Sequence, residues 1–429
     1  MKQLIKQTIN QLRQQPVISA VTIIGTALSI MLIMIVVMMQ QVKVAPFAPE
    51  SNRDRMLHYP FCSILHTDME NSESNHPCTE DMLKQLFKPM DIPEAVTIYT
   101  HCTEAMAIGV AGQPNIKVNV RETDGDYFKV FDFRFLAGQA AFADFDNGRP
   151  VVILSESTAR KVFNTIEGVV GREVNINYMP YKVVGIVSNV STLADNAYAE
   201  AWAPYKANDA TMNSTFNNGT GGIFSATILA KSRDDFDAIR QDYEKRLATF
   251  NEGWSKINCK VISRGRPYDQ ESYSIQVGAN NEPDVEAERM FRWIIYAILL
   301  IVPAINLTSM TQSRMRQRVS EIGVRRAFGC TRRQVMSQVI NENLIVTIIG
   351  GAIGVLLGII AAYLLTNIIF APDWSIVGTA PTVNPEMLIQ PSTIILALVF
   401  CFVLNLLSSG LPALWASRVN IVNALNKRK

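Results

Sequence analysis

The sequence lacks the short motifs that mark common catalytic sites. Residues 41–289 contain no Gly-x-Ser-x-Gly motif, no His-Glu-x-x-His motif and no paired-carboxylate arrangement. The glycine-rich stretch Gly219–Gly222 has neither the spacing nor the lysine of a phosphate-binding loop. We therefore assign no catalysis to this chain. The run Ser155-Glu156-Ser157 is interpreted as the end of a strand followed by a helix cap.

Charge is almost absent from four long stretches of the chain. A helix rises about 1.5 Å per residue, so 18 or more apolar residues can cross a hydrocarbon core of roughly 30 Å. The first stretch runs longer than the roughly 7–15 apolar residues of a signal peptide, and we interpret it as an uncleaved anchor. The predicted membrane spans are residues 17–39, 293–310, 344–370 and 393–415.

Basic residues are distributed unevenly between the segments that flank these spans. Residues 1–16, 311–340 and 416–429 are rich in lysine and arginine, and the middle segment alone carries seven arginines. Residues 41–289, which we call the outer domain, carry 25 basic and 34 acidic residues, and the loop 371–392 has no basic residue. The positive-inside rule therefore places both termini and residues 311–340 in the cytoplasm. The small net charge gives no indication of nucleic-acid binding.

The predicted fold class is a membrane protein with four transmembrane α-helices and a large α/β extracytoplasmic domain between helices 1 and 2. Within the outer domain, the apolar runs 151–154 and 181–187 are typical of strands, whereas 157–163 and 234–250 have helical spacing. The glycine- and asparagine-rich stretch 213–222 is expected to be an exposed loop. We expect the outer domain to contain two subdomains.

Four smaller features complete the predicted organisation. Residues 1–16 are expected to form a cytoplasmic amphipathic helix, residues 371–392 an outer loop, and residues 416–429 a cytoplasmic tail. The third span carries a stripe of small residues that allows another helix backbone to approach closely. These helix-packing glycines are Gly350, Gly354 and Gly358.

Residues 311–340, which we call the coupling hairpin, predict two helices joined by a tight turn. Met315, Val319 and Ile322 recur on one helical face, and Gly329 suits a left-handed stop. Thr331, followed three residues later by glutamine, predicts a capping box for the second helix. A plain basic loop would need the arginines alone, so this pattern favours a docking surface for a soluble partner.

The coupling hairpin resembles the cytoplasmic loop signature of MacB/FtsX-like ABC transporter permeases, with Cys330 where the family usually has alanine. The runs Asp126–Gly138, Val151–Phe163 and Tyr181–Val187 resemble the MacB-like periplasmic core domain of that family. The closing run Leu411–Leu425 resembles the motif after its last span, although a proline is usual where this chain has isoleucine.

This resemblance implies a dimeric cassette ATPase as partner, with ATP and Mg²⁺ held by that subunit and no cofactor on this chain. It also implies a second permease chain, identical or homologous, and leaves room for periplasmic or outer-membrane partners besides membrane lipids. The implied location is the bacterial inner membrane. Carried over residue by residue, the expected ATPase contact consists of Glu321, Gly323, Arg325, Arg326, Ala327 and Gly329.

The implied function is that of a permease-like subunit that transmits ATP-driven motion to its periplasmic domain. The substrate classes implied are peptides, lipoproteins and antimicrobial compounds, which would be exported or extracted. The absence of charged pairs from the spans favours mechanical transmission over a conduit. The alternative is a regulatory subunit of the FtsX type that relays the state of the ATPase to an extracytoplasmic cell-wall hydrolase.

Cysteine and histidine are scarce, but most of them gather in one part of the outer domain. The four outer cysteines, which include Cys259, allow three disulfide connectivities, and a bridge between Cys62 and Cys78 would close a short loop. Cysteine and histidine also bind zinc or copper, although regular ligand spacing is absent, so no metal site is assigned. The residues considered for one are His58, Cys62, His66, His76, Cys78, His101 and Cys102.

Overall fold

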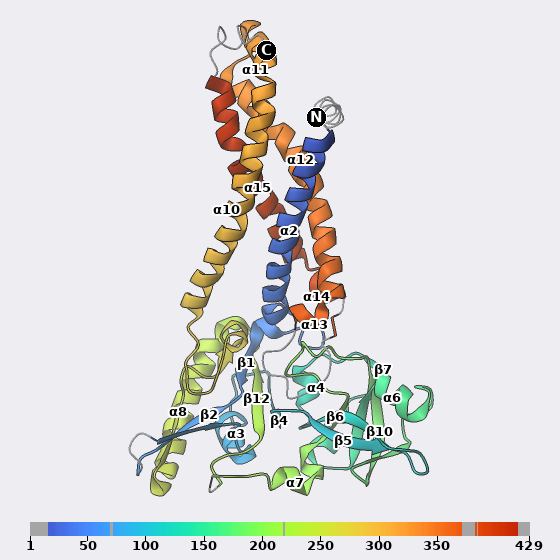
Figure 1. Cartoon of the computed structure of the whole chain (residues 1–429). Coiled ribbons are helices and arrows are strands. Elements are labelled where there is room, and N and C mark those ends of the chain that lie inside the picture. Colours follow the sequence, from blue (N-terminus) through green and yellow to red (C-terminus); the bar gives the residue numbers. More distant parts are fainter. Residues whose placement is uncertain (1–15, 69–71, 218, 371–381, 384, 419–429) are drawn as a thin grey trace. The chain divides into compact units, whose positions relative to one another are not determined.

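The computed structural model describes residues 16–68, 72–217, 219–370, 382–383 and 385–418 (Figure 1). These residues form two compact units. One, which we call the membrane unit, combines the first helix with Glu286–Phe370 and the chain from Val383 onward; the other is Lys43–Val285 of the outer domain, together with the segment that ends at Thr382. The predicted N-terminal helix, most of the outer loop and most of the C-terminal tail lie outside the described residues.

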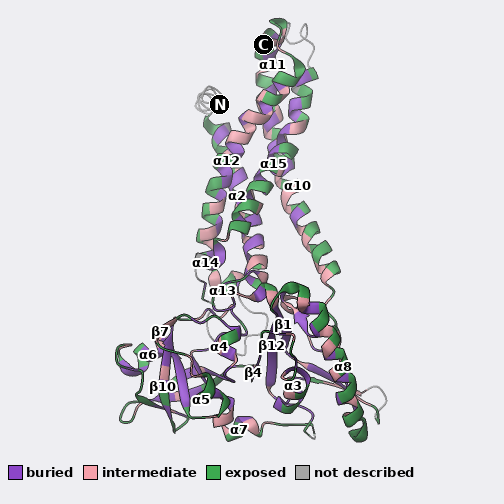
Figure 2. Ribbon diagram, turned by 180° about the vertical axis from the view of Figure 1, so that it is seen from behind, coloured by how far each residue is buried: buried purple, intermediate pink, exposed green. Residues whose placement is uncertain are grey.

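The membrane unit contains four helices that are long and apolar enough to cross a membrane, which confirms the four predicted spans. Their apolar faces remain largely exposed in Figure 2, with 74% of Leu364 and 68% of Trp293 accessible. Such faces fit a lipid solvent. The four helices are α2 (Pro16–Val44), α10 (Val285–Gln317), α12 (Arg332–Leu364) and α15 (Pro391–Arg418). The shorter helices of the unit are α11 (Val319–Ala327), α13 (Thr366–Ile369) and α14 (Pro385–Leu388).

The outer domain is built on an eleven-stranded mixed sheet and a separate three-stranded sheet. The small sheet has the order β13 (Cys259–Ile262), β2 (Cys62–His66), β3 (Ser72–His76). The large sheet has the order β11 (Ala201–Pro204), β8 (Val151–Ser155), β10 (Met179–Val187), β9 (Glu173–Ile176), β5 (Glu104–Gly109), β6 (Ile116–Thr123), β4 (Ala95–Thr100), β12 (Phe224–Leu229), β1 (Met56–Tyr59), β14 (Tyr268–Asp269), and β7 (Phe135–Gly138) pairs with β10.

Six strands of the large sheet close into a ring because β11 also pairs in parallel with β6. The ring runs β11–β8–β10–β9–β5–β6 and returns to β11, and the remaining strands continue from β6 as an open arm. The ring encloses its own apolar core, in which Val152, Leu154 and Val183 are fully buried. Closure removes free strand edges from this half of the domain.

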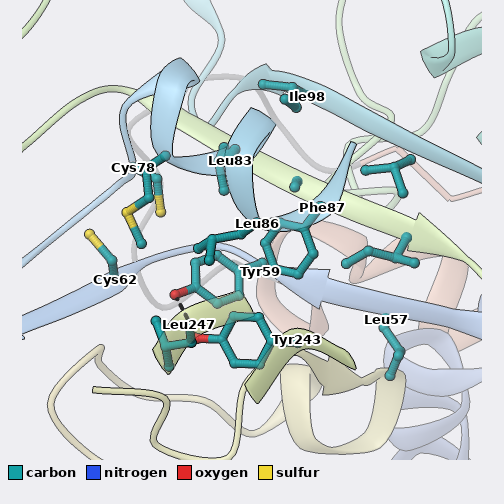
Figure 3. Close-up of a cluster of buried hydrophobic side chains, with 14 of the residues drawn as sticks. Leu57, Tyr59, Cys62, Cys78, Leu83, Leu86, Phe87, Ile98, Tyr243 and Leu247 are labelled. Atoms are coloured by element: carbon teal, nitrogen blue, oxygen red, sulfur yellow. Dashed lines mark hydrogen bonds between the residues drawn. The ribbon is translucent and has the colours of Figure 1, made fainter. Parts of the chain in front are cut away.

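The open arm packs against helices and forms a second core (Figure 3). Tyr59 of β1 donates or accepts a hydrogen bond of 3.1 Å with Tyr243, and the Phe87 and Tyr243 rings stack at 5.4 Å. These rings bring together β1, α3 and α8, whose apolar faces bury one another in this core. The helices of the outer domain are α3 (Glu80–Phe87), α4 (Tyr127–Val130), α5 (Phe142–Asp146), α6 (Glu156–Phe163), α7 (Asp209–Met212), α8 (Phe236–Trp254) and α9 (Gln270–Ser274).

Local sequence explains where the strand β8 stops. All five of its residues are buried, and Ser155 then caps α6 by accepting a hydrogen bond from the Thr158 backbone N–H. This confirms the strand-to-cap interpretation of that run. The predicted loop 213–222 is only partly exposed, because Thr220 is 3% accessible and Gly222 lies against Cys78.

Candidate functional site: the coupling hairpin

The coupling hairpin folds as the capping chemistry predicts. The helix α11 ends at Ala327, Gly329 adopts a φ of +95°, and α12 begins after Thr331. Thr331 Oγ1 accepts from the Gln334 N–H at 3.3 Å, while Thr331 N–H donates to Gln334 Oε1 at 2.8 Å. This reciprocal pair is the predicted capping box, and the left-handed glycine lets the chain reverse direction.

A small apolar core fastens α11 to its neighbours in the membrane unit. Met315 at the end of α10 and Ile322 of α11 pack with Val335 and Val339 of α12. Ala413 of α15 completes this core and is fully buried. The predicted shared face of Met315 and Ile322 is therefore confirmed, and three long helices meet on the short one.

Charged side chains reinforce these contacts around Arg318. Its Nε lies 3.1 Å from Glu321 Oε2, and its Nη1 lies 2.8 Å from Glu342 Oε2. Arg325 reaches Glu321 with its Nη2 at 2.6 Å and Gln338 with its Nη1 at 3.0 Å. Two of these contacts, Arg318–Glu342 and Arg325–Gln338, connect the α11 segment to α12.

The arginines expected at the ATPase contact are thus engaged within the chain. Arg326 Nη1 donates to the Ser417 carbonyl oxygen of α15 at 3.2 Å. The side chains of Glu321 and Arg325 still expose 44% and 38% of their surface, and Ala327 and Gly329 are exposed. These positions can meet a partner while they hold α11 in place, and the ATPase contact itself stays a prediction.

Gly323 differs from the other expected contact residues. It is buried, together with Val319 and Ile322, on the face of α11 that packs against the membrane unit. Its expected contact with the ATPase stays a prediction. Its small size allows close packing on this buried face.

The sequence analysis missed the most exposed apolar side chain of the coupling hairpin. Phe328 is 88% accessible, and Val324, one helical turn earlier, is 43% accessible. An exposed aromatic ring at the tip of a basic helix marks an interaction surface. The signal was a lone phenylalanine among arginines and glycine, where helix capping does not require an aromatic residue.

The packing glycines of α12 lie against α2 in the membrane unit. A Cβ at Gly350 would stand 2.8 Å from Thr26 Cβ, and one at Gly354 would stand 2.5 Å from the Ala27 carbonyl oxygen. At Gly358 the nearest atom would be Met34 Cβ at 3.2 Å. Helix backbones approach this closely only where side chains are missing.

The cysteines and histidines of the outer domain do not gather into one site. All six cysteines are described and are free thiols, so the Cys62–Cys78 bridge, one of the connectivities left open by the sequence, is not formed in this structure. Instead the Cys62 thiol accepts a hydrogen bond from Cys78, which together with His76 lowers the pKa of Cys62 to about 6 despite burial. No group of three or more metal-ligating side chains occurs in the described ranges.

The remaining metal candidates have separate partners. His58 Nε2 lies 2.9 Å from Gln270 Oε1, and burial lowers the pKa of His58 to about 4. His66 Nδ1 lies 3.6 Å from the Cys259 sulfur, while His101 Nδ1 lies 2.8 Å from Ser225 Oγ. Cys102 is exposed. Histidines in these positions act as hydrogen-bonded structural groups.

Two solved structures match part of this chain. The periplasmic region of MacB from Actinobacillus actinomycetemcomitans is 18% identical, and the match covers 47% of this chain and 88% of that one, with a TM-score of 0.33. The extracellular domain of the noncanonic ABC-type transporter YknZ from Gram-positive bacteria is 16% identical, with coverages of 47% and 99% and a TM-score of 0.33.

Curated relatives are similar over a longer stretch. The macrolide export ATP-binding/permease protein MacB of Salmonella typhi is 27% identical over 318 residues, and that of Escherichia coli K12 is 25% identical over 314 residues. These matches cover 73% and 72% of this chain. The chain spans 44% of the length of these relatives.

Two family models together match most of the chain. The MacB-like periplasmic core domain matches residues 19–246, and the FtsX-like permease C-terminal model matches residues 293–421. The two matches flank the start of α10 in the order that the sequence analysis expected. The chain therefore belongs to the MacB/FtsX-like family of ABC transporter permeases, with a MacB-like periplasmic core domain between its first and second membrane helices.

Proposed function

We propose that this chain is the transmembrane subunit through which an ABC transporter passes ATP-driven motion to a periplasmic domain. In this role it exports or extracts a peptide, a lipoprotein or an antimicrobial compound. The observation that carries the proposal is the attachment of α11 to α10, α12 and α15 at one place. A force applied to α11 would therefore be transmitted to α10, α12 and α15 of the membrane unit.

The accessible surface of the coupling hairpin suits a protein partner. Phe328 and Val324 form an exposed apolar patch, which we call the apolar knob. The half-exposed side chains of Glu321 and Arg325 place charges beside it. An aromatic anchor surrounded by polar groups is the usual composition of an interaction hot spot. The partner proposed is a dimeric cassette ATPase.

We assign ATP and Mg²⁺ to that partner. The 429 residues contain no Gly-x-x-x-x-Gly-Lys-Ser/Thr loop. The relatives named above are called ATP-binding/permease proteins, and this chain matches less than half of their length. Hydrolysis by a nucleotide-binding domain outside these residues accounts for both facts. The proposed arrangement pairs two permease chains in the bacterial inner membrane, with both termini in the cytoplasm.

Co-purification with the cognate cassette ATPase tests the proposal. The protein would be isolated in detergent with the ATPase and reconstituted in lipid, where ATPase activity is measured with and without the permease. Phe328→Asp places a charge in the apolar knob and is expected to abolish both association and stimulation. Arg325→Glu and Glu321→Lys are expected to weaken both.

Val277→Asp is the matched control, because Val277 is also 88% accessible but belongs to the outer domain. It should leave association unchanged. Normal ATPase binding and stimulation by all three coupling-hairpin variants would refute the proposal. Normal ATPase coupling combined with specific binding of a cell-wall hydrolase would instead support the regulatory alternative.

A further inference from the structure

The outer domain contains a cavity at the end of its strand ring. The cavity measures about 310 Å³ and lies where β5 begins, where β6 approaches its end, and beside the residues that follow β4. This volume is within the range of roughly 300–1,000 Å³ that is common for small-molecule sites, which often occupy the mouths of β-barrels. The cavity shares no residue with the coupling hairpin.

The strand register explains which side chains line the cavity. Glu104 of β5 pairs with Val120 of β6, and side chains two positions apart share one face of a strand. Met106 therefore lies on the same face as Glu104, and Glu122 lies on the same face as Val120. All four side chains line the cavity. Met106 and Val120 belong to the ring core, so the cavity has an apolar floor; Glu104 is exposed, whereas Glu122 is buried.

The charge of the cavity is one-sided. Its described lining includes two carboxylates and no lysine or arginine. Glu122 is 3% accessible, and its carboxylate accepts hydrogen bonds from Thr211 and, at 2.7 Å, from Asn208 Nδ2. Burial raises the pKa of Glu122 to about 7. A carboxylate can accept further hydrogen bonds beyond these two.

Two more lining residues indicate a ligand. Thr103 is 8% accessible, and its hydroxyl group has no hydrogen-bond partner among the described residues. A buried hydroxyl group usually has one, so a ligand atom would satisfy it. Phe216 leaves 42% of its surface exposed at the same cavity, and an aromatic face attracts cations.

We propose that this cavity binds a small apolar amine, with its ammonium group toward Glu122 and Thr103 and its apolar body against Met106 and Val120. Apolar contacts and a single acid deep in the site define this class of ligand. An anion would meet two carboxylates without a cation. A neutral apolar molecule would leave the Thr103 hydroxyl group and the Glu122 charge uncompensated.

Glu122 also has a structural task, because its bonds to Asn208 and Thr211 connect β6 to the segment of α7. Loss of stability in a variant would not by itself reveal a ligand site. The experiment therefore compares two probes of equal shape and different charge. The pair is 1-naphthylmethylamine and the neutral 1-naphthylmethanol, each titrated calorimetrically into the full chain in zwitterionic nanodiscs, with empty nanodiscs subtracted.

At about pH 8, where Glu122 and the amine both carry charge, the amine is expected to bind about tenfold more tightly than the alcohol. Glu122→Gln keeps the shape of the side chain and should remove this preference, and Thr103→Val should reduce it. Glu167→Gln, at an exposed acid of the same domain, is the matched control and should preserve it. Equal binding of the two probes to the parent protein would overturn the proposal.

A second measurement does not depend on a variant of Glu122. Cys102 is exposed and lines the cavity, so N-ethylmaleimide labelling of a Cys330→Ser variant, followed by mass spectrometry, reports its access. The amine should slow labelling of Cys102 several-fold, and the alcohol at equal concentration should not. Unchanged labelling would overturn the proposal. Since no nucleotide or ATPase is present, neither result bears on the coupling function proposed above.

Discussion

Arg318 Nη1 and Glu342 Oε2 lie 2.8 Å apart and connect the start of α11 to α12. Their side chains are 19% and 10% accessible, so solvent screens this pair less than a surface ion pair. Arg318 also contacts Glu321 within α11. The ion pair therefore helps to hold α11 against α12, as the proposed transmission of motion requires.

The Arg318–Glu342 pair should show energetic coupling in a double-mutant cycle. Arg318→Met and Glu342→Gln are each expected to destabilise the protein, with an interaction energy of about 1–3 kcal/mol in thermal unfolding in detergent. Both single variants should also lower ATPase stimulation. The exposed pair Arg160–Glu156 is the control and should couple by less than about 0.5 kcal/mol. Additive effects at the first pair would contradict the prediction.

Gly354→Ala should separate α12 from α2. The new Cβ would stand 2.5 Å from the Ala27 carbonyl oxygen and 2.9 Å from Ile30 Cβ, so a backbone has to move. Overpacking of this kind costs about 1–3 kcal/mol. Gly25→Ala in α2 is the control, since a Cβ there meets no atom within 4 Å. Melting temperatures in detergent should fall only for Gly354→Ala; equal values for the two variants would count against the helix contact.

The carboxyl group of Glu122 should make the outer domain less stable as pH rises. Its folded-state pKa of about 7 lies above the ordinary value of 4.5, so the folded protein holds a proton that the unfolded chain has lost. The contribution of this proton to the free energy of unfolding is complete below about pH 4.5 and is lost by about pH 7. The change amounts to about 3 kcal/mol at most. Hydrogen exchange of β6 in the full chain, compared with Glu122→Gln, measures this difference. A pH-independent difference would show that Glu122 does not titrate in this range.

His58 should act in the opposite direction. Burial lowers the pKa of His58 from 6.5 to about 4, so the unfolded chain binds a proton that the folded protein excludes. The contribution of neutral His58 to the free energy of unfolding is present above about pH 6.5 and is lost as pH falls to about 4. The loss amounts to about 3 kcal/mol at most. The protection factors of the backbone amides in β1 and β12 should therefore fall in acid, and His58→Gln should flatten this dependence. The same dependence of the protection factors on pH in the parent and in His58→Gln would refute this prediction.

Local chemistry made part of this structure predictable. The turn at Gly329 and the cap at Thr331 depend on residues within four positions of each other, and both occur as expected. The cap at Ser155 is of the same kind. Long charge-free runs likewise identified the four spans, because the length of an apolar helix alone decides whether it can cross a bilayer.

Other features depended on contacts between distant residues. Gly323 was predicted to contact the ATPase, and the structure shows in addition that it is buried, which the sequence of α11 alone did not indicate. The exposure of Phe328 follows from the same packing, because α11 has only one face to bury. Cys62 and Cys78 lie close together as free thiols. The strand pairing of β2 and the isolated β-bridge between Cys78 and Phe224 set their positions.

The sequence by itself determined that this chain crosses a membrane four times, carries a large α/β domain after its first span and turns sharply at Gly329. Each of these follows from the apolar length, the charge or the capping chemistry of a short segment. Only the tertiary structure decided that β6 and β11 close a ring, that α11 is fastened to three helices, and that Glu122 and Thr103 share a cavity. These relations depend on register and packing between residues far apart in the chain, which no local pattern encodes.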